Sequence, residues 1–343
     1  MLSLKTLNQQ RNTLNKLFEA NGLIFVKRPT YFLATATVPS YSQLSSLIAQ
    51  IKEYYSDCAF FYRGQECDCN ILLPSVARGS RATTKLYVYC QNHVEKEYEY
   101  ISAFQEYCKN HHPDYYYEDY LQFLAICQHY GIPTRLLDVT ANADVAAYFA
   151  TEYCKDEVGC IYIFIQSPQS EGEAILQQFI LEQPQLLHHC QILGVREAID
   201  LFLSWHPEIK TTAPELLQII TNHYNHRALL HVAPSNGLKD ERVVHQEGSF
   251  MLFGNALWSL PIYQKRLEKQ GFKATEDVFV ANELSKDSLK GVIKLRIPAE
   301  CKASILRCVM EKGITREFIY PSFESCAKTF LKNYEFENLN RTQ

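Results

Sequence analysis

The chain has 343 residues, 47% of them hydrophobic, so it is long enough to bury one large core or two smaller ones. Its formal net charge of −4 excludes the overall basic field that is typical of nucleic-acid-binding proteins. No apolar run approaches ~20 residues, and the N-terminus lacks the features of a signal peptide. We therefore expect a cytoplasmic protein that neither spans nor binds a membrane.

The N-terminal part, residues 1–55, is predicted to be a helical extension. Residues 1–18 are polar and helical in character, and residues 42–55 place Leu44, Leu47 and Ile51 at helical spacing. A short buried strand over residues 59–62 follows, ended by an Arg-Gly pair. An amphipathic helix is predicted over residues 91–109.

The next part of the chain alternates helices and strands. Asp119 can cap a helix that runs to Tyr130, because its side-chain oxygen can accept from the first free N–H groups. Gly131 ends that helix, and Pro133 prevents its continuation. Asn142 is the N-cap of a second helix, and residues 159–165 have the apolar, β-branched composition of a strand.

Residues 166–232 differ from their surroundings and are predicted to be a mostly helical insertion outside the sheet. The segment is rich in Leu, Gln and His. We expect breaks in the helices near its three prolines, Pro184, Pro207 and Pro214. We also expect the segment to pack on the main domain through three consecutive apolar residues, Leu201, Phe202 and Leu203.

The C-terminal part supplies further strands and helices. Strand candidates cover residues 242–245 and 249–253, and residues 291–297 alternate cleanly. Helices are predicted over residues 299–311 and 322–332. The whole chain is therefore predicted to be α+β, with a main domain at residues 56–332 and a tail at residues 333–343.

The 12 cysteines contain no CxxC pair. Cys67 and Cys69 form an isolated CxC, which lacks the second pair that a zinc site requires. We therefore expect no metal cofactor and interpret most of the cysteines as small buried hydrophobic residues.

The first motif that could carry chemistry is Tyr62-Arg63-Gly64-Gln65. A guanidinium is a planar fork that binds phosphate or carboxylate oxygens in pairs, so Arg63 is a candidate anion contact. Gly64 lets another group approach the backbone closely. The alternative is a structural ion pair of Arg63 at the end of its strand.

The second motif, residues 128–140, is denser in polar residues. The period of two in a strand places Asp138 and Thr140 on one face. The end of the preceding helix can orient His129 toward the same region. These three side chains are therefore candidates for one pocket.

Two further polar residues of this motif, Thr134 and Arg135, follow the turn at Pro133 and are candidates for the same pocket. We expect Arg135 and Asp138 to form a close, partly buried pair that fixes the turn. Such a pair needs tight geometry, because removing both charges from water is costly.

The third motif covers residues 242–250. On a strand the adjacent residues Gln246 and Glu247 would point to opposite faces, so only one of them can face a pocket. Gly248 indicates a bulge or the close approach of a ligand. The alternative is a solvated Glu247 and a Gln246 that satisfies backbone groups.

Together the three motifs resemble the FRG domain, a bacterial family named for its Phe/Tyr-Arg-Gly start. The resemblance covers about residues 55–332. Val139 stands where the family often has Trp. Outside the motifs the resemblance rests on Leu73-Pro74-Ser75, Ala146, Phe149-Ala150, Ile297-Pro298, Lys302, Ile305-Leu306, Gly313-Ile314 and Tyr320-Pro321.

A second resemblance is to mono-ADP-ribosyltransferases of the Arg-Ser-Glu type. Their Arg-Gly strand is similar to residues 62–64. Their Ser-Thr-Ser strand, which leads into a helix with Ala and Phe, is similar to residues 138–140 with Ala146 and Phe149. Their catalytic Glu would correspond to Gln246 or Glu247, the two candidate catalytic residues. The resemblance implies a central, mostly antiparallel sheet like the ADP-ribosyltransferase core.

This resemblance implies NAD as the candidate substrate. Arg63, with Gly64 and Gln65 beside it, would bind the pyrophosphate. Asp138 and Thr140 would hold the nicotinamide-ribose side, and the three remaining candidates for cofactor binding are His129, Thr134 and Arg135.

The group at position 246 would bind the ribose hydroxyls and stabilise the oxocarbenium-like transition state. The family's Glu aligns better with Gln246 than with Glu247. A neutral amide stabilises a developing cation less than a carboxylate does, so the departure favours binding over catalysis.

Two hypotheses follow. In the first, the chain is an NAD-consuming ADP-ribosyltransferase or glycohydrolase that acts as an effector in toxin or phage-defence biology, with a protein or nucleic acid as its target. In the second, it is a non-catalytic module that senses a nucleotide or a partner through the same pocket. A nuclease is disfavoured, because no carboxylate cluster has metal-binding spacing.

Overall fold

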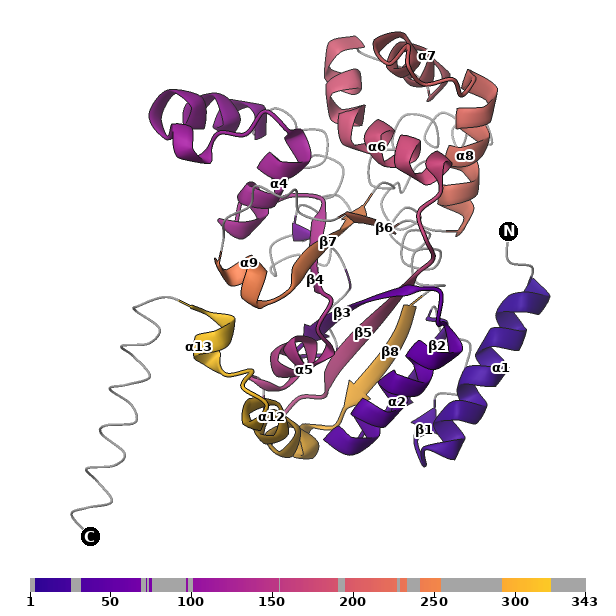
Figure 1. Cartoon of the computed structure of the whole chain (residues 1–343), viewed down its shortest axis with the longest axis vertical. Coiled ribbons are helices and arrows are strands. Elements are labelled where there is room, and N and C mark those ends of the chain that lie inside the picture. Colours follow the sequence, from indigo (N-terminus) through magenta and orange to yellow (C-terminus); the bar gives the residue numbers. More distant parts are fainter. Residues whose placement is uncertain are drawn as a thin grey trace, which may run out of the picture.

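The computed structural model describes residues 4–25, 32–68, 72, 74–75, 97, 101–153, 155–190, 195–226, 229–232, 241–253 and 292–321. Within these residues eight strands form one sheet in the order β1-β2-β8-β5-β3-β4-β7-β6 (Figure 1). Every neighbouring pair is antiparallel except β2 and β8. The α+β class and the mostly antiparallel sheet predicted from the sequence are confirmed.

The N-terminal part contributes strands as well as helices. Helices α1 (Leu4–Ala20) and α2 (Tyr41–Tyr54) flank β1 (Ile24–Phe25) and β2 (Ala34–Thr37). Ser40 caps α2, since its side-chain oxygen accepts from the backbone N–H of Gln43. Two strands of the sheet therefore come from a segment that was predicted to be helical.

The centre of the sheet is built from three strands. β5 (Gly159–Gln166) pairs with β3 (Ala59–Gln65) on one side and with β8 (Val292–Ile297) on the other. The strands expected at residues 159–165 and 291–297 are confirmed. β3 is longer than predicted, so Arg63 and Gly64 lie inside the strand rather than at its end.

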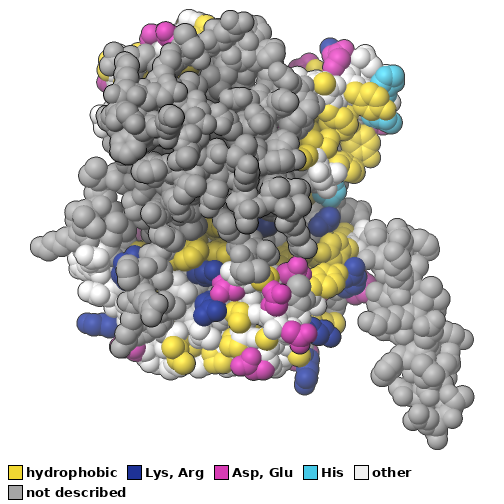
Figure 2. Space-filling view, turned by 180° about the vertical axis from the view of Figure 1, so that it is seen from behind, with side chains coloured by type: hydrophobic (Ala, Val, Ile, Leu, Met, Phe, Trp, Pro, Cys, Tyr) yellow, Lys and Arg dark blue, Asp and Glu magenta, His cyan; other side chains and the backbone are white. Residues whose placement is uncertain are grey.

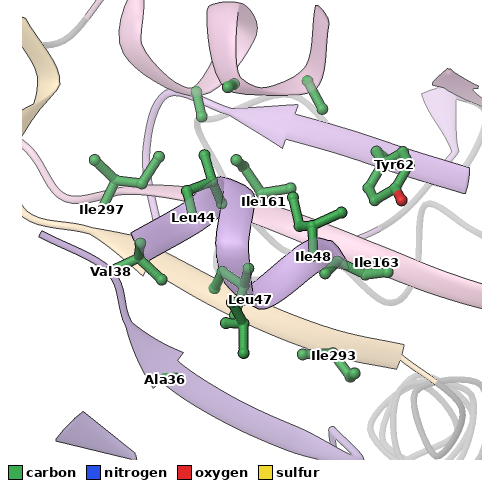
Figure 3. Packing of buried hydrophobic residues seen from close by; sticks show 14 of the residues in the cluster. Ala36, Val38, Leu44, Leu47, Ile48, Tyr62, Ile161, Ile163, Ile293 and Ile297 are labelled. Carbon is green, nitrogen blue, oxygen red and sulfur yellow. The ribbon is translucent and has the colours of Figure 1, made fainter. Parts of the chain in front are cut away.

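One hydrophobic cluster covers this half of the sheet. The side chains of Ile161, Ile163 and Ile293 alternate onto one face, where α2 packs on them through Leu44 and Leu47 (Figure 3). Helices α5 (Ala143–Thr151) and α12 (Lys302–Glu311) pack into the same cluster, with the short helix η4 (Ala299–Cys301) leading into α12.

The other half of the sheet consists of β4 (Leu136–Thr140), β7 (Gly248–Phe253) and β6 (Leu229–Val232). Helix α4 (Tyr120–His129) leads into β4. Asp119 caps α4 through the backbone N–H of Gln122, and Gly131 leaves the helix with a φ of +79°, a left-handed conformation that glycine adopts without strain. Asn142 likewise caps α5, so all three sequence signals are confirmed.

The helices of residues 171–226 cover this second half. They are α6 (Glu171–Cys190), α7 (Val195–Trp205) and α8 (Ala213–His226). Phe179, Phe202 and Leu216 are buried in a second cluster, together with Phe250 and Leu252 of β7. Leu201 and Leu203 pack against the same cluster, as predicted.

Two details of the predicted insertion are wrong. α6 continues through Pro184 without a break, whereas Pro207 separates α7 from α8 and Pro214 lies in the first turn of α8. The last four residues of the segment form β6, which pairs with β7 at the edge of the sheet.

The two halves of the sheet meet at a single pair of residues, Tyr62 of β3 and Thr140 of β4. By contrast, β3 shares seven residue pairs with β5, and β4 shares five with β7. By register, Tyr62, Thr140 and Gly248 lie on one face of the sheet, the face that carries both hydrophobic clusters. The sheet is therefore open between β3 and β4 beyond this pair.

Residues 242–245 are helical, so the predicted strand there is wrong. They belong to α9 (Glu241–His245), which is followed by a turn in which Glu247 has a φ of +46°. The chain must reverse here before β7 can pair with β4, and a helical turn with one left-handed residue reverses it in few residues. Further along, α13 (Arg316–Ile319) follows α12. The helix predicted at residues 322–332 lies outside the described residues.

Gly64 is required by the packing of α5 on β3. A Cβ at this position would lie 1.9 Å from the backbone oxygen of Ala146 and 2.8 Å from the backbone nitrogen of Ala150. The close approach inferred from the sequence is thus made by a helix of the protein itself.

We expect Gly64→Ala to lower the free energy of unfolding by about 3 kcal/mol, because helix and strand must separate to admit the methyl group. Denaturant unfolding followed by circular dichroism measures this. Gly172→Ala is the matched control, since its Cβ would meet only the flexible end of the Ile219 side chain at 3.2 Å. Equal unfolding midpoints for the two variants would contradict the proposed packing.

Candidate functional site

A pocket of about 250 Å³ lies where β3 and β4 separate, bordered by α4, α5 and α9 (Figure 1). Residues of all three sequence motifs line it. The described lining residues are Tyr62, Arg63, Gly64, Gln128, His129, Asp138, Val139, Thr140, Phe149, Arg242, Val243, Gln246, Gly248, Ser249 and Phe250. The structure thus brings Arg63, His129, Asp138, Thr140 and Gln246 together around one pocket.

Arg63 bridges the opening between the two strands. Its Nη1 donates to the backbone oxygen of Asp138 at 2.6 Å and lies 3.7 Å from the Asp138 carboxylate. The side chain is 16% exposed. Its Nε is buried and has no hydrogen-bond partner within the described part of the chain. Arg63 therefore satisfies a carbonyl that β3 leaves unpaired and retains one N–H for which a ligand oxygen would be a partner.

Gln128 holds Asp138 in place. Its Oε1 accepts from the hydroxyl of Thr134 at 2.7 Å and lies 3.1 Å from the hydroxyl of Ser75. Its Nε2 then donates to the Asp138 carboxylate at 2.9 Å. Both ends of the amide have specific partners, so its orientation is fixed. Thr134 is fully buried and supports this network from behind, outside the pocket lining.

Arg135 does not pair with Asp138, so this prediction is wrong. Arg135 is buried, and its guanidinium forms an ion pair with Glu97, which is buried as well. The Nε–Oε2 distance is 2.7 Å, and Nη1 donates to the backbone oxygen of Ile180 at 2.9 Å. Residues three apart along an extended chain point to opposite sides, so Arg135 faces inward while Asp138 faces the pocket.

Thr140 connects the second motif to the third. Its hydroxyl donates to the backbone oxygen of Gln246 at 2.5 Å and accepts from the backbone N–H of Asn142 at 2.9 Å. The turn before β7 is thereby tied to the N-terminus of α5. Thr140 lines the pocket, but its hydroxyl is already engaged by the backbone.

The two candidate catalytic residues differ in position. Gln246 lines the pocket, and its Nε2 donates to the backbone oxygen of Ile319 at 2.9 Å. Glu247 is not among the described lining residues, and its carboxylate accepts from the side-chain amide of Asn142 at 2.9 Å. Both lie in a turn rather than on a strand, so the alternation assumed for them does not apply.

Arg242 and Phe149 line the pocket although they were not among the predicted site residues. The guanidinium of Arg242 lies 4.9 Å from the ring centroid of Tyr320, and the ring of Phe149 lies 6.5 Å from the same ring. His245 stacks on Phe318 at 5.4 Å. The place of Arg242 in the third motif could have identified it as a site residue. The strand predicted for residues 242–245 hid its position at the pocket. Gln65, at the end of β3, is not among the described lining residues.

The permanent charges of the described lining residues favour an anion. Among these residues are two that carry a guanidinium, Arg63 and Arg242, and one that carries a carboxylate, Asp138. Tyr62, on the wall of the pocket, stays neutral because burial raises the pKa of its hydroxyl well above the ordinary value. Paired guanidinium groups bind phosphate oxygens through charge-assisted hydrogen bonds.

Within the described residues, no three His, Cys, Asp or Glu side chains are arranged to hold a metal ion. No described helix combines the length and apolarity that a membrane span requires. Six described cysteines are free thiols, three of them buried, and Cys67 is buried and disulfide-bonded.

The corrected ion pair gives a stability prediction. We expect Glu97→Ala to lower the free energy of unfolding by about 3–5 kcal/mol, because it leaves the buried guanidinium of Arg135 without its counter-ion. Asp138→Ala should cost less than about 1 kcal/mol, since that carboxylate is 56% exposed. Thermal and denaturant unfolding of both variants measures the difference. A larger loss for Asp138→Ala than for Glu97→Ala would contradict the assignment.

Comparisons with known proteins agree with the first two motifs. Residues 58–158 match the family model of the FRG domain, and this range contains Arg63 and the whole of residues 128–140. The third motif lies beyond the matched range. Searches of curated proteins and of solved structures each found no match, so the likeness to ADP-ribosyltransferases remains a hypothesis drawn from the motifs. Residues 58–158, which hold the first two motifs, are therefore similar to the FRG domain.

Proposed function

We propose that the pocket between β3 and β4 binds a phosphate-bearing nucleotide, with NAD as the candidate ligand. The observation that carries this proposal is that two guanidinium groups, Arg63 and Arg242, and one carboxylate occur among the described residues that line the pocket. The free Nε of Arg63 adds a donor that a phosphate oxygen would satisfy. The resemblance of the first two motifs to ADP-ribosyltransferases points to NAD among the nucleotides.

On this proposal Arg63 and Arg242 bind the pyrophosphate, and the nicotinamide-ribose half enters the pocket. Cleavage of the nicotinamide bond requires a group that stabilises an oxocarbenium-like cation. Asp138 is the only carboxylate among the described lining residues, and the amide of Gln128 orients it. We therefore assign the stabilising role to Asp138, in place of Gln246 or Glu247.

This assignment makes the chain an NAD-cleaving or ADP-ribosyl-transferring effector, with water, a protein or a nucleic acid as the acceptor. An effector of this kind fits a role in toxin or phage-defence biology in a bacterial cytoplasm.

A second candidate function is non-catalytic sensing of a nucleotide. One observation favours it: both residues that correspond to the transferase glutamate have structural partners. The amide of Gln246 is bound to Ile319, and the carboxylate of Glu247 to Asn142. With both groups engaged, a pocket whose glutamate position has no free side chain would bind the nucleotide without cleaving it.

Binding can be tested by calorimetry with NAD, ADP-ribose and inorganic pyrophosphate. We expect the wild type to bind all three, and Arg63→Ala to weaken each by about tenfold or more, because a charge-assisted hydrogen bond is lost. Arg63→Lys should recover little of this loss, since an ammonium cannot reproduce the paired hydrogen bonds. Arg307→Ala, on the exposed side of α12, is the matched control. A wild type that binds none of the three would contradict the proposal.

Turnover separates the two candidate functions. NAD hydrolysis is followed by release of nicotinamide from the wild type, Asp138→Asn and Glu247→Gln. Asparagine can still accept from Gln128 but carries no charge, so we expect Asp138→Asn to retain binding and to lose turnover by about 100-fold or more. Glu247→Gln should keep turnover. Binding without turnover by the wild type would favour sensing, and loss in Glu247→Gln alone would overturn the role given to Asp138.

A further inference from the structure

A row of aromatic rings leads outward from the pocket. His129 lines the pocket, and its ring centroid lies 5.0 Å from that of Tyr130, with the ring planes at 89°. Tyr130 in turn lies 5.7 Å from Tyr115 of the short helix η2 (Pro113–Tyr115), at 83°. Edge-to-face contacts of this kind hold neighbouring rings in a defined arrangement. Tyr115 and Tyr130 therefore form an ordered extension of the pocket rim.

Both tyrosines are exposed although their rings contact one another. Tyr130 is 56% exposed and Tyr115 is 45% exposed. Tyr130 follows the last residue of α4, and the left-handed Gly131 turns the chain away directly after it. Figure 2, which shows the molecule from behind, has hydrophobic and histidine side chains gathered at its upper right. This is the side of the molecule on which α4 lies in Figure 1. Ordered rings exposed beside a pocket are typical of a binding surface.

The size of the pocket leaves part of a dinucleotide outside it. Its volume of about 250 Å³ is below the range of ~300–1,000 Å³ in which proteins enclose drug-sized ligands. A dinucleotide held at Arg63 by its pyrophosphate and filling the pocket with one nucleoside must place its other nucleoside at the rim. The row of rings begins at His129, which lines the pocket, and continues through Tyr130 to Tyr115.

We propose that Tyr130 and Tyr115 form a stacking subsite for the adenine of NAD, the half that the pocket does not enclose. This inference rests on the proposed function, since it requires the pyrophosphate at Arg63. Stacking of a base on an aromatic side chain contributes ~1–3 kcal/mol. Three exposed acidic residues next to Tyr115 in the sequence, Asp114, Glu118 and Asp119, would repel the phosphates of a nucleic-acid strand but not an uncharged adenine. The surface therefore suits a single base better than a polynucleotide.

The test compares four probes on the full chain: NAD, ADP-ribose, nicotinamide mononucleotide and inorganic pyrophosphate. Tyr130→Ala should weaken NAD and ADP-ribose, which carry adenine, by about tenfold. It should leave nicotinamide mononucleotide and pyrophosphate unchanged. Tyr130→Phe retains the ring and should bind all four probes as the wild type does.

Tyr107→Ala is the matched control. Tyr107 has a similar exposure, 50%, and lies in the preceding helical residues 101–111. Its ring contacts those of Phe104 and His111, which are not part of the row. Equal loss for the probes with and without adenine, or no loss at all in Tyr130→Ala, would overturn the subsite and leave the proposed function standing. A wild type that binds none of the four probes would overturn both.

Discussion

The organisation of the site depends on how little backbone β3 and β4 share. They pair only through Tyr62 and Thr140, so the carbonyl groups beyond this pair have no strand opposite them. A backbone carbonyl with no strand opposite it can accept from a side-chain donor instead. Arg63 is that donor, through its bond to the Asp138 carbonyl. The same gap that requires a guanidinium also provides the pocket that the guanidinium faces.

The two strands can stay apart because each is held from its own side. Helix α5 packs directly on Gly64 of β3, and Leu136 of β4 is buried in the second hydrophobic cluster. The polar residues of the second motif are divided accordingly. Thr134 and Arg135 face inward and fix the turn, whereas Gln128 and Asp138 face the pocket. A single sequence motif thus contains both residues that line the pocket and the residues that support them from behind.

The parts of this fold that could be predicted from the sequence are those set by local interactions. The caps at Asp119 and Asn142, the stop at Gly131 and the alternation of residues 291–297 each depend on a few neighbouring residues. The types of residue at the site were also recognisable, because guanidinium, amide and carboxylate groups beside glycine are uncommon in a purely structural segment.

The predictions that failed concerned contacts between residues that are distant in the sequence. The partner of Arg135 is Glu97, 38 residues earlier, and no local pattern indicates it. The β-branched pair Val243-Val244 favours a strand, yet the reversal needed before β7 imposes a helical turn and brings Arg242 to the pocket. Strands β1, β2 and β6 are only two to four residues long, so their sequences carry too little periodicity to separate them from loops.

The contacts made by α13 and Tyr320 have a consequence for any shortened form of the chain. Gln246 is bound to the carbonyl of Ile319, His245 stacks on Phe318, and the ring of Tyr320 lies against Arg242. One wall of the pocket is thus braced by residues that come some 70 positions later in the sequence. A protease that cut before Arg316 would leave the sheet with its central strands intact while removing the brace on Arg242 and Gln246. A form of the chain that ends before Arg316 is therefore expected to lose the shape of this wall while its sheet stays folded.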